Sequence, residues 1–315
     1  MNSSSNSLSG PVQAPQRSSP ARGLPALLIG LAWVLVCAYL YRESLRSLVD
    51  LATHNDNTSH ILLIPLISGW LLYLDRKRLL GSRSFDFFAP LLLMIPAILV
   101  VSFSLQSQSL NASERLTGLT LSLVLFLQAG FVAVAGRKAA RESWFALAFL
   151  LLAVPLPDAI LDRFIYALQA GSAAVAEVLF DWTGVSVLRE GFIFRLPRVS
   201  IEVAQECSGI RSSIALLVLA ILVSHFAFRP FWKKVVFVAA GLVMMVVKNG
   251  VRIATLTLLA NFVDPGFLYG RLHHQGGVVF FLFGLGLLWP IYWLLRRGGV
   301  TASEHAPAKS TATLA

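Results

Sequence analysis

Charged residues are scarce in this sequence. Only 13% of the residues are charged, 56% are hydrophobic, and the mean hydropathy is +0.72. A soluble globular domain carries about a quarter charged residues, so this composition excludes the soluble class. Cysteine is scarcer still, because Cys37 and Cys207 are the only two. Two cysteines rule out a disulfide scaffold and a cysteine-rich metal site.

Long apolar runs fill the chain instead. They recur from residue 24 almost to residue 297 and are long enough to cross a bilayer. The sequence therefore predicts an all-α polytopic membrane protein with about eight transmembrane helices. The eight apolar segments cover residues 24–41, 60–74, 87–105, 115–135, 143–156, 208–228, 235–260 and 274–295. Cys37 lies in the first segment without polar neighbours, which favours a role as lipid-facing or core filler.

A small extracytoplasmic element is predicted before the sixth span, at 157–206. Its first part, 159–180, has a helical pattern but carries several charged residues, which favours an amphipathic helix at the membrane interface. Its second part, VSVLREGFIFRLPRVSIEVAQEC, alternates apolar and polar residues around two turn signals, Arg189-Glu190-Gly191 and Leu196-Pro197. This pattern predicts a short hairpin-like element at the membrane surface.

The distribution of basic residues predicts the orientation. More than half of the 26 Lys and Arg residues fall in the tails and in three short loops on one side, which the positive-inside rule makes cytoplasmic. Both termini are therefore expected in the cytoplasm, with 1–23 and 298–315 as disordered tails around a membrane domain at 24–297. This distribution also accounts for the net charge of +10, so no nucleic-acid partner is expected.

Three polar residues are predicted to reach a similar depth near the outer surface. Cys207 lies at the outer mouth of the sixth span, and His273 and His274 lie at that of the eighth. Arg252 stands about 25 Å up the seventh span, in the outer third of a core about 30 Å thick. A neighbouring cation lowers a thiol pKa, histidine transfers protons, and arginine stabilises an oxyanion. Together they suit acyl transfer, without a metal or another cofactor.

Each residue also has a structural interpretation. A cysteine at the end of a span is more often structural than catalytic. Arg252 can pair with Glu202 or Glu206 and simply orient the helices, and Lys248, one turn earlier, is interpreted as an ion-pair partner. The histidine can be an interfacial cap.

Two other classes of membrane protein compete with the acyl-transfer interpretation. One is a transferase that acts on lipid-linked saccharide or acyl groups, which would need no thiol. The other is a transporter that binds an anion through Arg252 and Lys248. A transporter is expected to place its polar residues at the midplane, whereas these gather at the outer edge.

Three sequence blocks resemble the signature blocks of the exosortase/archaeosortase family. They are VAQECSGIRSS, NGVRIATL and LHHQGGVVFF, in this order and each at a predicted outer edge. The supporting runs SHILLIPLISGWLLYLDRKR, VPLPDAILDRF and GVSVLREGFIFRLPRVSIEVAQECSG also resemble the family. The resemblance covers most of residues 55–295.

The resemblance implies a multispan enzyme of the bacterial inner membrane with its active site facing the periplasm. Such enzymes process proteins that end in a short motif such as Pro-Glu-Pro, a transmembrane helix and a basic tail. They share a function with soluble sortases but not a fold. The resemblance implies that Cys207 is the nucleophile of a cysteine protease or transpeptidase, and that Arg252 stabilises the oxyanion or the thiolate.

The resemblance also bears on the choice of histidine. The family spacing His-x-x-x-Gly fits His273 with Gly277, which makes His273 the expected catalytic residue and His274 the reserve. Gly277 is expected to let the eighth span pack closely beneath the site. The family often has an acidic residue two positions before the cysteine, where this chain has Gln205, and Glu206 follows it. The roles of the nearby glutamates therefore stay open.

Overall fold

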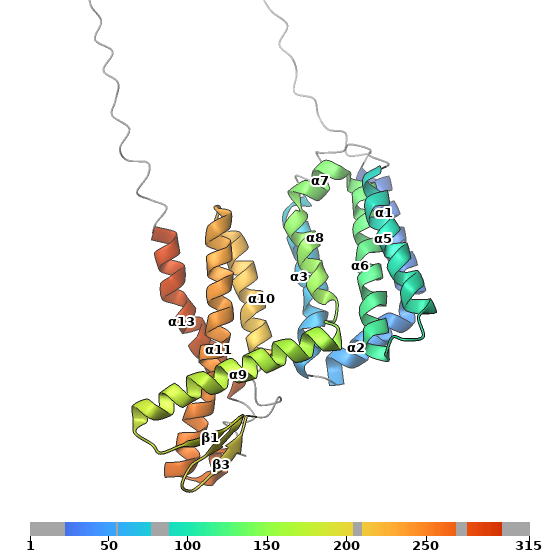
Figure 1. The fold of residues 1–315 in the computed structure, drawn as a ribbon. Coiled ribbons are helices and arrows are strands. Elements are labelled where there is room, and N and C mark those ends of the chain that lie inside the picture. Colours follow the sequence, from blue (N-terminus) through green and yellow to red (C-terminus); the bar gives the residue numbers. More distant parts are fainter. Residues whose placement is uncertain (1–22, 55, 77–87, 204–209, 269–275, 298–315) are drawn as a thin grey trace, which may run out of the picture.

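The fold is mostly helical, as predicted, and was analysed in a computed structural model. The structure describes residues 23–54, 56–76, 88–203, 210–268 and 276–297. Figure 1 shows two groups of helices that run side by side, with one long helix, α9 (Asp158–Thr183), crossing beneath both and a small sheet at its far end. The predicted tails lie outside the described residues, apart from Gly23.

The first group is built around α5 (Phe88–Gln106) and α6 (Ala112–Ala135). α1 (Gly23–Leu40) packs against α6 and then bends by 76° into α2 (Arg42–His54). The indole nitrogen of Trp33 donates to the carbonyl of Phe126 at 2.9 Å, and Cys37 is 4% exposed in the same core. The burial of Cys37 confirms its interpretation as core filler.

Short helices complete this group. They are η2 (Asp56–Leu62), α3 (Leu63–Leu74), α7 (Arg137–Glu142), α8 (Trp144–Leu150) and η3 (Leu151–Ala153). Ser68 of α3 donates to the carbonyl of Ala146 at 2.7 Å, which joins α3 to α8. Their shared apolar core, which includes Ile64 and Phe149, also receives Val218 and Leu222 from α10 (Ile210–Ala227). α10 therefore connects the two groups.

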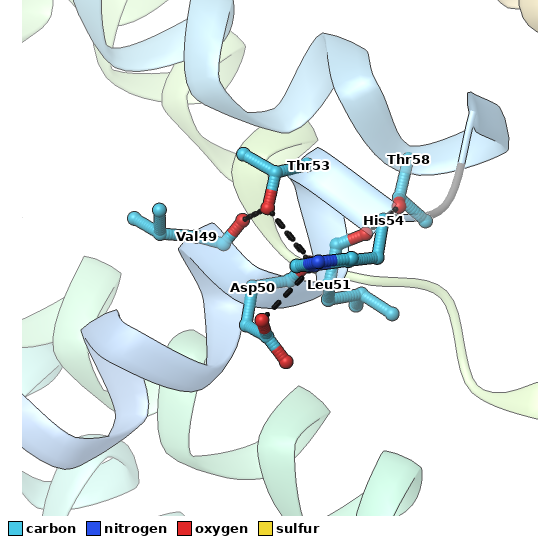
Figure 2. Close-up of polar contacts among 6 residues, drawn as sticks. All are labelled: Val49, Asp50, Leu51, Thr53, His54 and Thr58. Carbon is cyan, nitrogen blue, oxygen red and sulfur yellow. Dashed lines mark hydrogen bonds and ion pairs between the residues drawn. The ribbon is translucent and has the colours of Figure 1, made fainter.

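The join between α2 and η2 is made by hydroxyl groups, as Figure 2 shows. Thr53 donates to the carbonyls of Val49 and Asp50 in the last turn of α2, and Thr58 donates to the carbonyl of Leu51 at 3.0 Å. His54 and Asp50 form an exposed pair at 3.0 Å. Of these carbonyls, only that of Leu51 lacks an i+4 partner within α2, so the Thr58 hydrogen bond caps the end of the helix.

The second group consists of α10, α11 (Phe231–Phe262) and α13 (Gly277–Arg297), with α9 packed across α11. Its largest apolar core joins Ile165 and Leu168 of α9 with Leu216 of α10, Met245 of α11 and Leu288 of α13. α9 begins after Pro157, and Gly184, whose φ of 70° is left-handed, caps its C-terminal end. A helix thus occupies the predicted segment and crosses the other helices (Figure 1), and its place at the membrane interface stays a prediction.

The predicted hairpin is confirmed and gains a third strand. β1 (Leu188–Glu190), β2 (Ile193–Arg195) and β3 (Ser200–Glu202) form an antiparallel sheet in sequence order. The tight turn between β1 and β2 requires Gly191, whose φ is 64°. Phe194 is fully buried against Phe180 of α9 and in one core with Ile253 of α11. The position of this sheet outside the membrane stays a prediction.

The predicted count of eight spans is not confirmed. The structure has a helix at every predicted segment, but five described helices are long and apolar enough to span alone, and the bent α1–α2 pair would make six. Three segments give shorter apolar helices, at Thr58–Leu74, Trp144–Ala153 and Arg211–Ala227. α9, which the sequence placed at the interface, meets the same criteria of length and hydropathy. The length and hydropathy of a helix therefore do not distinguish a membrane span from a helix at the interface.

Replacing Gly250 with alanine is expected to destabilise the protein. An added Cβ would lie 2.5 Å from Val175 and 2.9 Å from the backbone oxygen of Ser172, so α9 and α11 would have to move apart. Overpacking of this kind costs about 1–3 kcal/mol. The measurement is thermal unfolding of the purified variant.

Gly286→Ala is the matched control for the Gly250 variant. No described atom lies within 4 Å of its added Cβ, so only the higher helix propensity of alanine, up to about 1 kcal/mol, should act. Equal melting temperatures for the two variants would show that α9 does not constrain α11.

Candidate active site

Arg252 is the one residue of the predicted trio whose position the structure describes. It lies on α11 and is half-buried. Cys207, His273 and the reserve His274 lie outside the described residues. The elements next to them are described, because α10 begins at Ile210 and α13 begins at Gly277. The geometry of the candidate site is therefore built from the first turns of α10 and α13 and from the Arg252 turn of α11.

These three helices meet at Lys248. The side chain is 1% exposed, and its amine donates a hydrogen bond to the hydroxyl of Ser212 in the first turn of α10. On α13, Gly284 approaches the same side chain so closely that an added Cβ would lie 3.2 Å from Lys248 Cδ. Arg252 follows Lys248 by one turn on the same helix face. The turn that carries Arg252 is thus held next to the starts of α10 and α13.

A second polar residue lies at the same level. Asn249 is 1% exposed, and neither its amide nitrogen nor its oxygen has a hydrogen-bond partner among the described residues. Ser213 of α10 is fully buried, and its hydroxyl likewise has no partner there. Buried polar groups are normally paired, because leaving one unpaired costs about 1–3 kcal/mol. Polar groups therefore collect next to the predicted site inside an otherwise apolar bundle.

The chain that leads toward Cys207 is fixed up to Val203. Val203 is 1% exposed, its N–H donates to the carbonyl of Phe192 at 2.9 Å, and its carbonyl accepts a hydrogen bond from Gln169 of α9. The N–H of Arg198 donates to Asn261 near the end of α11 at 3.2 Å. α9 and α11 therefore hold the sheet from two sides, and the chain is held in place at Val203, four residues before Cys207.

Two sequence-based interpretations are wrong in the described part of the structure. Lys248 was expected to form an ion pair, but its partner is the hydroxyl of Ser212, and no described carboxylate pairs with it. The close packing expected at Gly277 is absent, because no described atom lies within 4 Å of its added Cβ. The close approach occurs two turns later, at Gly284, where α13 crosses α10 and α11.

A comparison with protein families gives the identity of the chain. The family model described as transmembrane exosortase matches residues 50–290. The chain belongs to the exosortase family. Comparisons with curated proteins and with solved structures return no match. The resemblance seen in the sequence is therefore confirmed at the level of the family, and this exosortase is a multi-pass membrane protein.

The exosortase match includes every residue of the predicted trio and the polar residues that sequence analysis did not select. Ser212, Gln169 and Asn249 belong to this second group. In the sequence, each is a polar side chain inside an apolar helical run, where a buried polar group is expected to need a hydrogen-bond partner. The signal marks such positions, but it does not say which helix supplies the partner.

Replacing Ser212 with alanine is expected to destabilise this exosortase by about 1–3 kcal/mol, because a buried amine would lose its acceptor. The adjacent Ser213→Ala is the matched control. Its hydroxyl is buried without a partner among the described residues, so removing it should be neutral or slightly stabilising. Thermal unfolding of the two purified variants checks both. A larger loss in Ser213→Ala than in Ser212→Ala would contradict the assigned role of Lys248.

Proposed function

We propose that this exosortase is a membrane-embedded cysteine protease or transpeptidase. It cleaves a C-terminal sorting signal of the Pro-Glu-Pro type at the outer face of the bacterial inner membrane. Cys207 is the nucleophile, Arg252 the electrostatic stabiliser and His273 the proton-transfer residue. The observation that carries the proposal is the meeting of α10, α11 and α13 at Lys248, in a chain that belongs to the exosortase family.

The spacing along each helix supports the proposed site. Ser212 follows Cys207 by five residues, and Arg252 follows Lys248 by one turn, toward the same end of the bundle. Gly284 lies about 10 Å along α13 from Gly277, at a rise of about 1.5 Å per residue. Two described contacts of Lys248, with Ser212 and with Gly284, thus bring together the helices whose first turns adjoin the proposed catalytic residues.

The chemistry follows from these residue types. The Cys207 thiol gives its proton to His273, and the thiolate attacks the carbonyl carbon of the scissile peptide bond. Arg252 donates hydrogen bonds to the oxyanion that forms. The carbon–nitrogen bond breaks, His273 returns the proton to the leaving amine, and a thioester remains on Cys207. An amine or water then attacks the thioester and regenerates the thiol. No cofactor or metal takes part.

The proposed substrates are secreted or surface proteins that carry the motif, a transmembrane helix and a basic tail. The substrate helix would lie in the bilayer beside this exosortase, with its basic tail and both enzyme termini in the cytoplasm. The motif would then emerge at the sheet and α9, whose anchoring through Val203 and Gln169 gives this side of the site a fixed wall. Glu202, the last residue of β3, is exposed.

Cys207→Ala and Cys207→Ser are expected to abolish processing, because neither side chain supplies a thiolate. The measurement is the mass of a co-expressed reporter that carries a C-terminal motif, a transmembrane helix and a basic tail. Cys37→Ala is the matched control, since Cys37 is a buried core residue without a proposed role. Its reporter should still be processed.

Processing that persists in Cys207→Ala would exclude the cysteine mechanism. Processing in Cys207→Ser but not in Cys207→Ala would favour the competing membrane transferase, which needs a polar side chain but no thiol. An equal loss in Cys37→Ala would mean that the cysteine variants act through folding.

His273→Ala is expected to lower processing at least about 100-fold, which is the lower range for a proton-transfer residue. His274→Ala, its neighbour in the sequence, should retain most of the activity. The same reporter measures both, with each variant's level in the membrane fraction as the control. The reverse result would assign proton transfer to His274 and leave the Cys207 mechanism intact.

A further inference from the structure

A groove of about 780 Å³ lies between α10 and α13, in the half of these helices that ends at Arg296. We call it the lateral groove. Its lining includes Leu219 and Phe226 of α10 and Leu285, Trp289, Tyr292 and Arg296 of α13. The volume falls in the range of about 300–1,000 Å³ that is typical of small-molecule sites. The groove begins next to the Lys248 contacts, since Leu285 follows Gly284, and runs from there toward Arg296, away from the proposed catalytic residues.

The walls of the lateral groove are apolar and open to the side of the bundle. Phe226 is 57% exposed and Trp289 is 67% exposed, and both border the groove. In a multi-pass membrane protein such a surface faces acyl chains. An acyl chain in the groove would contact α10 and α13 together, which buries more apolar surface than contact with a single helix face would.

One end of the groove carries a positive charge. The Arg296 guanidinium donates to the hydroxyl of Tyr292 at 3.2 Å, and no described carboxylate pairs with it. Arg297, the next residue, instead lies 3.2 Å over the ring of Trp293 and does not line the groove. A guanidinium with donors to spare fits a phosphate, and basic pockets between transmembrane helices bind anionic headgroups.

We propose that the lateral groove binds one anionic phospholipid, with an acyl chain along α10 and α13 and the phosphate on Arg296. Charge decides between this occupant and a substrate helix. A transmembrane segment that ends in a basic tail would bring like charges to Arg296, whereas a phosphate complements it. The lipid site uses none of the catalytic residues, and only the argument against a substrate helix rests on the proposed function.

The bound lipid would act as a packing element of the bundle. α10 and α13 form opposite walls of the groove, so an acyl chain between them contacts both helices at once. These are two of the three helices that meet at Lys248. Lipid binding is therefore expected to raise the thermal stability of the full-length protein, and phosphatidylglycerol should raise it more than phosphatidylcholine.

The test uses full-length protein in a mild detergent and palmitoyl-oleoyl phosphatidylglycerol or phosphatidylcholine as probes. Native mass spectrometry counts the bound lipids, and a phosphatidylglycerol with a photoreactive acyl chain locates them. Arg296→Ala should weaken phosphatidylglycerol binding about five-fold, the factor that one arginine contributes near anionic lipid. Arg297→Ala, with the same change of charge, should have no such effect.

A second pair of variants tests the apolar part of the groove. Leu285→Trp fills the groove and should reduce cross-linking by the photoreactive chain, whereas Leu294→Trp, on the opposite face of α13, should not. Cross-links are expected in α10 and α13. The proposal is overturned by equal binding of the two lipids, by equal effects of Arg296→Ala and Arg297→Ala, or by cross-links confined to other helices. A dimer that Leu285→Trp dissociates would also overturn it, because a second copy would then occupy the groove.

Discussion

The arrangement of the candidate site depends on one buried lysine. Lys248 is enclosed by three helices, and its amine is satisfied by Ser212 of α10 while its methylene groups lie against Gly284 of α13. An amine without an acceptor would be costly in this apolar bundle, so the register of α10 against α11 is constrained by that hydrogen bond. The same constraint sets the depth of Arg252 relative to the first turns of its neighbours.

Glycines at the helix crossings also determine how the second group of helices packs. Gly250 and Gly171 let α9 and α11 approach closely, and Gly284 does the same for α13. Small residues at crossings allow helices to pack by van der Waals contact where lipid removes the hydrophobic driving force between them. The polar residues of the site are therefore carried on backbones that cannot slide past one another without a clash.

Some of this could be predicted from the sequence, and the limits have physical causes. Alternation and the turn at Gly191 predicted the hairpin, because strand periodicity and a left-handed turn are local properties. The family blocks pointed to the right family. The number of spans was not predictable in the same way. The predicted span at 60–74 forms only a short apolar helix, whereas α9, predicted to lie at the interface, is long and apolar enough to span. The bond between Lys248 and Ser212 joins two helices, and polarity alone does not reveal such a partner.

α11 also acts as a rigid spacer. Phe262 follows Lys248 by fourteen residues, whereas Gly277 precedes Gly284 by seven, so α11 continues about 10 Å beyond the start of α13. Within that extension, Asn261 accepts the N–H of Arg198 and so holds the loop between β2 and β3. Because an uninterrupted helix resists bending, the sheet is kept at a constant distance from the start of α13. α11 is thus a molecular ruler: its length beyond Lys248 sets how far a bound chain would have to extend from the first turn of α13 to contact the sheet.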